Sequence, residues 1–490
     1  MEFERELAAT ESPIDGLYVV DLSVHGDDRG WFKENWQKAK MEAAGLPPFN
    51  PVQNNVSFNA NRGVTRGIHA EPWDKFISVA CGSVFGAWVD LRPGKGFGTV
   101  FTCVIDPSVA VFVPRGVGNA FQALEDGTAY TYLVNAHWSA ELKKTYTFVN
   151  LADPELDIQW PIPLDQCTLS EADEHHPRLA DALAMEPRRT LVTGCHGQLG
   201  QAVRALAQER GVGEWFDYCD IDTFDMSDAS AYDGVDWDLY GTVINCGAYT
   251  AVDAAETGEG RRTCWAANAQ GPALLAATCA ARGITLVHVS SDYVFDGVEE
   301  LHGEDEPFGP LGVYGQSKAA GDLAVAVAPA HYILRSSWVV GRGKNFVRTM
   351  AALSDRVADG DDALEQVRVV DDQIGALTFT DEMAAAIFWL LGYREGDVEP
   401  SEPAAFGTYN LSGAGEVASW AEIARTVFEA RNGNGGAVVP VSTADYYAGA
   451  AGPVSPRPRF SGLDLSKIEA AGFAPAPWRE TLATYMAEEL

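Results

Sequence analysis

The first 165 residues alternate short apolar runs with turn residues, and a helical period is nearly absent from them. Three of these runs, 83–91, 99–105 and 109–113, are rich in β-branched and aromatic residues. Glycine and proline separate them at 93–94 and 114–116. Short strands at roughly ten-residue spacing with such turns are typical of antiparallel sandwiches and barrels. The pattern therefore predicts an all-β N-terminal half.

A different pattern begins near residue 190. A polar stretch with helical character, 171–185, ends at Glu186-Pro187-Arg188-Arg189 and is interpreted as a helix leading to a domain boundary. Beyond it, strands are predicted at 190–193, 242–245 and 285–290, with a helix at 198–209. Strands that alternate with helices indicate βαβ units and a doubly wound parallel sheet, the Rossmann type of α/β fold. We predict two domains, residues 1–185 and 189–490, fused from proteins of different class.

The net charge of the chain limits the kinds of partner that it can bind. Among 490 residues, 69 are Asp or Glu and 35 are Lys or Arg, which gives a formal charge of −34 and a pI near 4.5. Such a surface repels nucleic-acid phosphates and anionic lipids, so we expect neither nucleic acid nor a membrane as a partner. The N-terminus has no secretory pattern, and the longest strongly apolar run, Ala384 to Leu391, is shorter than the ~20 residues of a membrane span. We expect a soluble, cytoplasmic protein.

The cysteines indicate the same compartment. None of the eight forms a CxxC pair, and several lie in apolar runs. They are Cys81, Cys103, Cys167, Cys195, Cys219, Cys246, Cys264 and Cys279. This distribution predicts reduced, buried thiols and argues against a disulfide framework or a zinc site.

A glycine-rich turn follows the first strand of the C-terminal half. It reads Thr193-Gly194-Cys195-His196-Gly197-Gln198-Leu199-Gly200, with a strand before it and a helix after it. Glycines let the backbone turn tightly and approach a pyrophosphate, which then lies at the positive N-terminus of the helix. The same pattern also occurs in ordinary strand-to-helix connections, so the turn alone does not identify a dinucleotide site.

A tyrosine and a lysine four residues apart add a catalytic signal. Tyr314 and Lys318 fall on one face of a predicted helix. An ammonium beside a phenol favours the phenolate, so we predict that Lys318 lowers the pKa of Tyr314. Such a phenol can give a proton to a carbonyl oxygen while a hydride reaches the carbon. Ser291, which follows a buried strand 23 residues before Tyr314, supplies a hydroxyl to hold that oxygen. Together with the glycine turn, these residues predict a dehydrogenase.

The C-terminal half, from Leu191 to the end, resembles the extended short-chain dehydrogenases and, among them, the dTDP-4-dehydrorhamnose reductases. The motifs that carry the resemblance are Gly194–Gly200, Asn245–Asp253, Ser290–Gly297, Tyr314–Lys318, Leu334–Trp338 and Val369–Gln373. The resemblance implies that Ser291, Tyr314 and Lys318 reduce a 4-keto sugar on a thymidine diphosphate, with NADPH or NADH as cofactor. Ser291 stands where the family usually has Thr, and the hydroxyl is kept.

The same resemblance implies the binding residues. The cofactor set is Gly194, Gln198, Leu199, Gly200, Asp225, Met226, Cys246, Gly247, Ala248, Tyr314 and Lys318. The substrate set in this half is Thr250 and Trp338. Asp225-Met226 is similar to the family's contact on the adenosine side, and it does not decide between NADPH and NADH. A metal at this half is also left undecided.

In the N-terminal half, Arg66-Gly67-Ile68-His69 is followed by Lys75. Histidine is suited to act as a base near neutral pH, and a nearby ammonium can stabilise an enolate oxygen. A single histidine in a β-sandwich is more often a core residue or a metal ligand. The cupin metal pattern of closely spaced histidines with a carboxylate is missing, so no metal is predicted here.

This half resembles the dTDP-4-dehydrorhamnose 3,5-epimerases, which implies a cupin-like jelly roll. The matching segments are Asp28–Glu34, Gln53–Ser57, Arg66–His69, Lys75, Gly82–Phe85, Val113–Gly116, Tyr132, Ile158–Pro161 and Leu169–Asp173. The resemblance implies that His69 is the base, Asp173 orients it, Lys75 stabilises the enolate and Tyr132 is the acid. The implied substrate set is Arg29, Glu34, Gln53, Asn55, Arg66 and Asn119, with Arg115 a further phosphate candidate. We expect a homodimer through this half.

Three positions depart from the epimerase pattern. Asn119 replaces a usual second histidine, Ala70-Glu71 replaces a Phe-Gln pair, and His137-Trp138 stands where tyrosines often stack on the nucleotide. Whether both C3 and C5 or C3 alone is epimerised is therefore open.

The leading hypothesis is a bifunctional enzyme that epimerises dTDP-4-dehydro-6-deoxy-D-glucose and then reduces the product to dTDP-L-rhamnose. A second hypothesis keeps the reductase and makes the β-half a silent nucleotide-sugar-binding or dimerisation module, which would need no acid-base set. A third is a dinucleotide-sensing regulator built on an inactive dehydrogenase. Such proteins typically lose the Tyr or the Lys, and both are present here.

Overall fold

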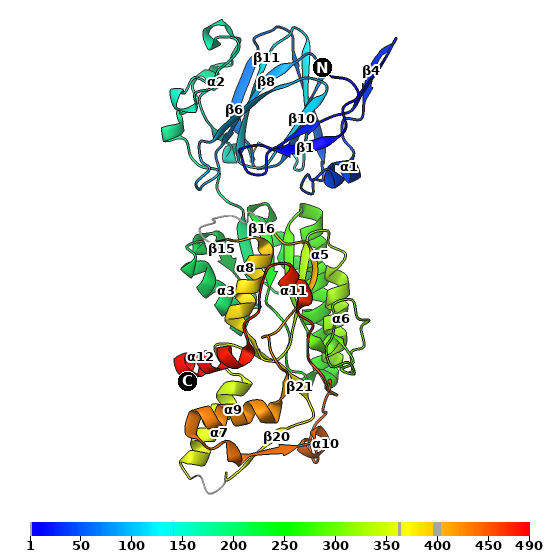
Figure 1. Cartoon of the computed structure of the whole chain (residues 1–490), viewed down its shortest axis with the longest axis vertical. Coiled ribbons are helices and arrows are strands. Elements are labelled where there is room, and N and C mark those ends of the chain that lie inside the picture. Colours follow the sequence, from blue (N-terminus) through cyan, green and yellow to red (C-terminus); the bar gives the residue numbers. More distant parts are fainter. Residues whose placement is uncertain (1, 141, 361–363, 395–402) are drawn as a thin grey trace. The chain divides into compact units, whose positions relative to one another are not determined.

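The computed structural model describes residues 2–140, 142–360, 364–394 and 403–490. The chain divides into two compact units, Met1–Pro187 and Arg188–Leu490. Figure 1 shows β-strands dominating the N-terminal unit and alternating strands and helices in the C-terminal one. This agrees with the two fold classes predicted from the sequence. None of the described helices is long and apolar enough to cross a membrane.

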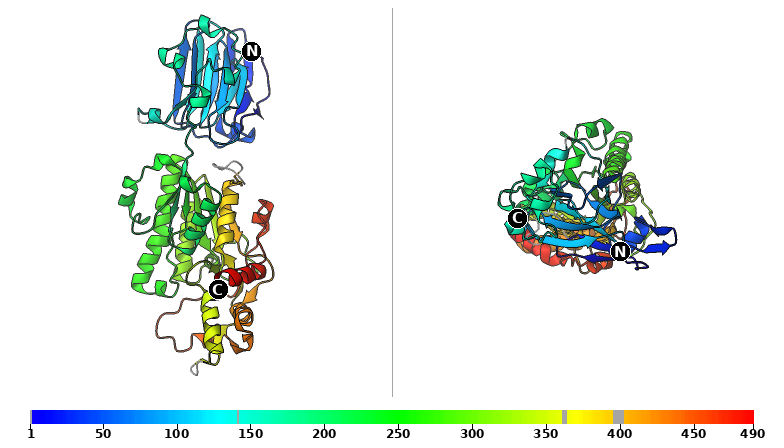
Figure 2. Two further views of the ribbon diagram at one scale, coloured as in Figure 1. Left: turned by 90° about the vertical axis from the view of Figure 1, so that its left-hand side faces the viewer. Right: turned by 90° about the horizontal axis from the view of Figure 1, so that it is seen from above.

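Two antiparallel sheets form the N-terminal unit, as expected for a jelly roll. The six-stranded sheet runs in the order β1 (Ala8–Glu11), β2 (Tyr18–Asp21), β10 (Val109–Val113), β7 (Lys75–Cys81), β12 (Thr128–Val134) and β5 (Gln53–Asn59). The five-stranded sheet runs β13 (Thr147–Phe148), β6 (Thr65–Ala70), β11 (Val117–Ala123), β8 (Val84–Asp90) and β9 (Val100–Ile105). Figure 2 shows the long strands running side by side. A separate hairpin consists of β3 (Val24–Asp27) and β4 (Gly30–Lys33).

The alternation of side chains along these strands builds the core between the sheets. Ile77 and Val111 of the six-stranded sheet pack with Val84, Trp88 and Phe121 of the other. Successive strand residues point to opposite faces, so every second residue enters this core. The outer face of the six-stranded sheet packs against α1 (Lys38–Ala43) through a cluster around Met41.

The predicted helix over 171–185 is wrong beyond its first turn. One α-helical turn forms, α2 (Glu171–Glu174), followed later by a short 3-10 helix at Leu179–Asp181; the hydroxyl of Ser170 accepts a hydrogen bond from the Asp173 N–H at the start of α2. Pro177 follows closely, and the residue before a proline is disfavoured in helical conformation. Leu179 instead packs against the apolar cluster on the outer face of the five-stranded sheet. The proline and the packing of a few side chains therefore end the helix after one turn, although most of the segment is exposed.

A six-stranded parallel sheet organises the C-terminal unit. Its order is β15 (Phe216–Tyr218), β14 (Arg189–Thr193), β16 (Tyr240–Asn245), β17 (Thr285–Ser291), β18 (His331–Ser336) and β23 (Gly407–Leu411). The helices around it are α3 (Gln198–Glu209), α4 (Gly258–Trp265), α5 (Gly271–Arg282), α6 (Val313–Val325) and α8 (Thr380–Leu391). Helices α3 and α8 pack on one face and α5 and α6 on the other, as Figure 1 shows. The strand order reverses between β14 and β16, which is where such sheets bind ligands.

A smaller subdomain is inserted after β18. Its helices are α7 (Phe346–Ala358), α9 (Trp420–Asn432), α10 (Thr443–Tyr446) and α12 (Trp478–Glu489), whereas α11 (Ser466–Ala470) packs on the core of the parallel sheet through Ile468. Its strand pairs are β19 (Val339–Val340) with β22 (Thr378–Phe379), β20 (Val367–Val370) with β25 (Val438–Val441), and β21 (Ile374–Gly375) with β24 (Ala418–Ser419). Helices α7, α9 and α12 share one core around Phe428 and Trp478.

All eight cysteines are free. Cys195, Cys264 and Cys279 are buried, four others are half-buried, and Cys81 is exposed. The expectation that the thiols are buried is therefore wrong for Cys81, which ends the β7 strand at a turn.

Candidate active sites

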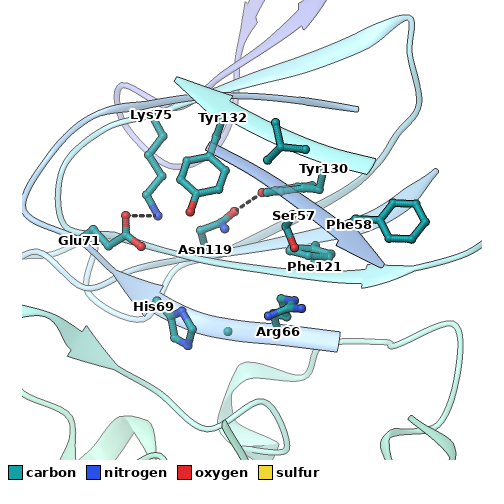
Figure 3. Close-up of a pocket in the computed structure, with 12 residues that line it drawn as sticks. Ser57, Phe58, Arg66, His69, Glu71, Lys75, Asn119, Phe121, Tyr130 and Tyr132 are labelled. Atoms are coloured by element: carbon teal, nitrogen blue, oxygen red, sulfur yellow. Dashed lines mark hydrogen bonds and ion pairs between the residues drawn. The ribbon is translucent and has the colours of Figure 1, made fainter. Parts of the chain in front are cut away.

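The N-terminal unit contains a pocket of 530 Å³ between its two sheets (Figure 3). Strands β6 and β11 line it from one sheet, and β5, β7 and β12 line it from the other. The lining residues are Val56, Ser57, Phe58, Arg66, Gly67, His69, Glu71, Lys75, Asn119, Phe121, Tyr130 and Tyr132. The epimerase resemblance implies catalytic roles for His69, Lys75, Tyr132 and Asp173. The first three line this pocket, and Asp173 does not.

His69 and Tyr132 reach the pocket from opposite sides (Figure 3). His69 lies on β6 and pairs in register with Asn119 on β11, whereas Tyr132 lies on β12 of the other sheet. A glycine makes the close approach of β6 and β11 possible, because a Cβ on Gly67 would lie 2.6 Å from that of Ala120, and its φ is +122°. A base and an acid therefore face each other across the space that a sugar ring can occupy.

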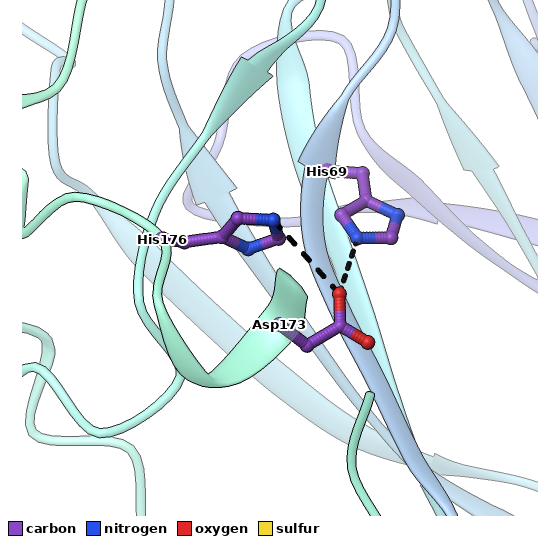
Figure 4. Close-up of side chains that lie close together, drawn as sticks. All are labelled: His69, Asp173 and His176. Atoms are coloured by element: carbon purple, nitrogen blue, oxygen red, sulfur yellow. Dashed lines mark hydrogen bonds and ion pairs between the residues drawn. The ribbon is translucent and has the colours of Figure 1, made fainter. Parts of the chain in front are cut away.

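Asp173 holds His69 from behind (Figure 4). Its Oδ1 lies 2.8 Å from His69 Nε2, and the Asp173 side chain is 7% exposed. Hydrogen bonds from His69 and Ser170 keep the pKa of Asp173 below its usual value, although burial acts in the opposite direction. His176 was missed from the sequence and also belongs to this cluster, with its ring 5.4 Å from that of His69. Burial lowers the pKa of His176, and this favours its neutral form.

A buried ion pair stands beside Tyr132. Lys75 Nζ lies 2.8 Å from Glu71 Oε2, and 5.8 Å from the centre of the Tyr132 ring. Burial, together with the charge of Glu71, raises the pKa of Tyr132 to about 12, while Arg66 acts to lower it. The phenol is therefore protonated at neutral pH, as an acid must be. Glu71 was noted in the sequence only as a departure from the family pattern.

The residues expected to bind substrate in this unit fall into two groups. Arg66 and Asn119 line the pocket. Gln53 and Asn55 lie on the edge strand β5, where Asn55 pairs in register with Tyr132 and Gln53 donates a hydrogen bond to Asn55.

The hairpin residues expected to bind substrate lie outside this pocket. Arg29 pairs with Asp27 at the hairpin turn and is 89% exposed, and Glu34 accepts a hydrogen bond from Lys40. Arg115, the further phosphate candidate, donates to the carbonyl of Glu186. The fold of one chain therefore gathers only part of the predicted substrate set.

In the C-terminal unit, the glycine turn lies at the reversal point of the sheet. Gly194 has a φ of +66°, and a Cβ there would lie 2.5 Å from the backbone nitrogen of Gly247, which follows β16. Gly200 is equally close-packed, since its Cβ would lie 2.5 Å from the carbonyl of Gly194. Helix α3 begins at Gln198, and its N-cap residue Gly197 provides no side-chain cap, so its first N–H groups remain available to a phosphate.

The other residues expected to bind the cofactor fall into two groups: some lie beside the glycine turn, and others have side chains that contact the rest of the protein. Cys246, Gly247 and Ala248 follow β16, and Met226 lies against Gly247, with its Cε 3.3 Å from the position of a Cβ there. Asp225 accepts hydrogen bonds from Ser227. By contrast, Leu199 is buried in the core and the Gln198 side chain accepts a hydrogen bond from the Gly341 N–H. The side chains of Leu199 and Gln198 therefore hold the glycine turn in place through contacts with the protein.

A residue at the end of β15 was missed. Asp220 accepts hydrogen bonds from the N–H groups of His196 and Ile221, and this fixes the glycine turn. It follows Gly200 by twenty residues, the spacing at which Rossmann folds place the acid that binds the adenosine ribose.

Ser291, Tyr314 and Lys318 are brought together by β17 and α6. Ser291 ends β17, and its hydrogen bond to Tyr314 acts to lower the pKa of the phenol. The prediction that Lys318 lowers this pKa is wrong, because burial dominates and raises it above the ordinary value. Lys318 Nζ instead donates to the carbonyl of Val289 at 2.6 Å, and burial lowers the pKa of Lys318 to about 8. The neutral phenol is the form that can donate a proton.

The predicted substrate residues of this unit lie in loops. Thr250 is exposed after β16, and Trp338 stacks on Trp420 with a centroid distance of 3.8 Å. Arg457, a cation close to Tyr293, was not identified from the sequence. Arg457 pairs with Asp253 at 2.8 Å, and its charge acts to lower the pKa of Tyr293.

Tyr293 in turn packs edge-on against Tyr314. The Arg457-Pro458-Arg459 sequence in an otherwise acidic chain was the available signal for this cation.

Among the residues that the structure describes, two groups of side chains have atoms suitable for a metal. They are His69, Asp173 and His176, and Cys195, His196 and Asp220, with the ligand-type atoms of each group within 4.8 Å of one another. In the first group, the contact of His69 with Asp173 is at hydrogen-bond distance. The expectation that no metal takes part stays a prediction.

The two sites define two classes of enzyme: an acid-base epimerase in a cupin-like jelly roll, and a short-chain dehydrogenase on a Rossmann sheet. Family models agree with both. The model for dTDP-4-dehydrorhamnose 3,5-epimerase matches residues 11–181, and the model for the RmlD substrate binding domain matches residues 188–490. The chain belongs to the RmlD family through its C-terminal unit and to the dTDP-4-dehydrorhamnose 3,5-epimerase family through its N-terminal unit.

Individual relatives cover one unit each. A Streptococcus pyogenes protein named "Protein RmlC homolog" is 52% identical over 192 residues, which are 38% of this chain and 96% of that protein. The dTDP-4-dehydrorhamnose reductase of Mycolicibacterium smegmatis is 34% identical over 63% of this chain and 88% of its own. The crystal structure of the Bacillus anthracis dTDP-4-dehydrorhamnose reductase in complex with NADP is 31% identical, with a TM-score of 0.52, and covers 62% of this chain and all of that one.

Proposed function

We propose that the chain catalyses two consecutive reactions of dTDP-L-rhamnose synthesis. The N-terminal unit epimerises dTDP-4-dehydro-6-deoxy-D-glucose at C3 and C5, and the C-terminal unit reduces the C4 ketone of the product with NADPH or NADH. The observation that carries this proposal is the presence, on one chain, of a His–Asp pair facing a tyrosine and of a Ser–Tyr–Lys set beside a glycine turn. The two family matches support the same assignment.

In the epimerase site, His69 is the base. The C4 carbonyl acidifies the hydrogens at both C3 and C5, so one base can remove a proton at either carbon. Asp173 orients the imidazole and stabilises the charge that it gains. The Lys75 ammonium stabilises the enolate oxygen, and Tyr132 returns a proton from the opposite face, which inverts the carbon. Placement of His69 and Tyr132 on opposite sheets supports this division of roles.

In the reductase site, NADPH or NADH would supply the hydride for C4 when bound beside Tyr314. Tyr314 donates its proton to the C4 oxygen, and Ser291 holds that oxygen by a hydrogen bond. Lys318 acts as the cation behind the tyrosine. The uncapped start of α3 and the close approach of Gly194 to Gly247 fit a pyrophosphate at this turn. Thr250 and Trp338 are proposed to contact the sugar nucleotide.

Arg29 and Glu34 are proposed to act across a homodimer. Their hairpin exposes Trp31 and Phe32 to 38% and 70%. The edge strand β5 also exposes Val56 and Phe58, both at 66%. Exposed apolar residues on an edge strand and a projecting hairpin favour association with a second copy. We further propose a cytoplasmic location, which the free cysteines support.

The alternative of a silent β-half explains the pocket less well. A module that only binds nucleotide sugar needs neither the His69–Asp173 pair nor a half-buried, protonated Tyr132. The regulator hypothesis is disfavoured in the same way by the intact Ser291, Tyr314 and Lys318.

Two single variants test the proposal against each other. Tyr314→Phe should abolish NADPH oxidation and leave deuterium exchange at C3 and C5 intact, whereas His69→Asn should abolish the exchange and starve an intact reductase. Neither variant by itself should form dTDP-L-rhamnose from the unepimerised ketone. A mixture of the two variants should form it, because the epimerised intermediate can diffuse from one molecule to another. If His69→Asn oxidises NADPH at the wild-type rate with the unepimerised ketone, the two-step assignment is wrong.

A further inference from the structure

The epimerase pocket contains a carboxylate to which the proposed reaction gives no role. Glu71 directly follows β6, four residues before Lys75, which begins β7. The two side chains form an ion pair of 2.8 Å, with Glu71 11% and Lys75 5% exposed. Figure 3 shows this pair on the same side of the pocket as Tyr132. Both charges are thus largely buried in a site where a neutral ketone reacts.

The pairing determines where the ammonium can be. A buried ammonium without a counter-ion is strongly unfavourable, and its four-carbon stem has many rotamers. Glu71 offsets the charge and selects the rotamer that leaves Nζ 5.8 Å from the centre of the Tyr132 ring. Removal of the carboxylate would leave the Lys75 ammonium without its counter-charge near the phenol, in a medium that screens it poorly.

Tyr132 experiences charges from several elements. The titratable and charged side chains that face it are Arg66 and His69 on β6, Glu71 after it, Lys75 on β7, Tyr130 on β12, and Tyr146 before β13. Burial is the largest influence on the pKa of Tyr132 and raises it, Glu71 raises it further, and Arg66 lowers it. Glu71 is thus the carboxylate that offsets the two nearby cations.

We propose that Glu71 is a positioning residue of the epimerase site, which fixes the Lys75 ammonium and maintains Tyr132 as a proton donor by balancing the cations around it. This proposal rests on the proposed epimerase function. It adds a residue that acts through Lys75 and Tyr132 and does not itself exchange a proton with the sugar. A Gln, which the family usually has at this position, would keep the shape and lose the charge.

The test is the pH profile of deuterium exchange at C3 and C5 of the 4-keto sugar, measured without NADPH on the full chain. In Glu71→Gln, the cations around Tyr132 are no longer balanced and favour the phenolate. The alkaline limb of kcat/KM should therefore move to lower pH by about one unit, with roughly a tenfold loss of exchange on that limb and a smaller loss near neutrality. Glu71→Asp, which keeps the charge, should retain the wild-type position of the limb at a reduced rate.

Glu42→Gln is the matched control, because Glu42 is an exposed acid on α1 of the same unit. It should leave both the rate and the limb unchanged. If the limb of Glu71→Gln coincides with that of the wild type, or if Glu71→Asp moves it as far as Gln does, the proposal is overturned. Should Glu71→Gln not fold, the position of the limb in Glu71→Asp decides alone. Absence of exchange in the wild type would overturn the proposed function itself, and this proposal with it.

Discussion

Breaking the buried ion pair of the C-terminal unit should destabilise that unit alone. Arg335 on β18 donates from Nε to Asp322 Oδ2 on α6 at 2.9 Å, and the two side chains are 4% and 1% exposed. Arg335 also donates to the carbonyl of Glu304, and its guanidinium lies over the rings of Phe295 and Phe308. The variant Asp322→Asn keeps the size of the side chain and leaves the arginine without its counter-charge.

The size of the effect follows from the burial of both partners. Removal of one member of a buried pair costs about 3–5 kcal/mol, because the remaining charge stays desolvated. At about 2.1 cal/mol/K per residue, a unit of roughly 300 residues has an unfolding entropy near 0.6 kcal/mol/K. The melting temperature of the C-terminal unit should therefore fall by roughly 5–8 °C.

Calorimetry of the full chain measures this directly, and the transition of the N-terminal unit serves as an internal control. The double variant Asp322→Leu with Arg335→Met removes both charges and should recover most of the loss. The reasoning would be refuted if the melting temperature of the C-terminal unit in Asp322→Asn lay within about 1 °C of the wild type. A double variant that is less stable than the single variant would refute it as well.

Further predictions concern the two sites and the boundary. Because burial lowers the pKa of Lys318 to about 8, its ammonium is present below that pH and is lost above it, so kcat/KM for NADPH oxidation should fall about tenfold per unit at higher pH. A profile that stays flat to about pH 10 would contradict this. Asp173→Asn should slow C3 and C5 exchange by about 10²–10⁴-fold, because His69 loses its orienting carboxylate; a change below about threefold by NMR would assign Asp173 a structural role only. Expressed separately, residues 1–187 and 188–490 should each unfold cooperatively, and aggregation of both fragments would show that they depend on a shared core.

One helix and one strand, in different units, were the elements that the sequence predicted with their observed bounds. The helix over 198–209 forms with the predicted bounds, and the strand at 109–113 does so as well. In both cases the local signal and the tertiary packing agree: the helix has one apolar face against the sheet, and the strand is buried along most of its length. In residues 171–185 the helical pattern fails after one turn, where Pro177 follows and Leu179 packs on the apolar cluster of the five-stranded sheet.

The site residues were predicted where chemistry and chain order sufficed. His69 and Asp173 are 104 residues apart, and only the family resemblance joined them before the structure placed them at 2.8 Å. The sequence could not show that the fold desolvates Tyr314 or that Lys318 bonds the carbonyl of Val289, so the predicted direction of the tyrosine pKa was wrong. Desolvation depends on the whole fold, and the spacing of two residues on a helix does not report it.

The central claim is that one chain performs both reactions, and a single NMR experiment in D₂O tests it. The wild-type chain is incubated with dTDP-4-dehydro-6-deoxy-D-glucose and NADPH, and the configuration and isotope content of the product are determined. The account predicts dTDP-L-rhamnose with deuterium at both C3 and C5. A reduced sugar that keeps the D-configuration and carries no deuterium would contradict it, because reduction would then have occurred without epimerisation.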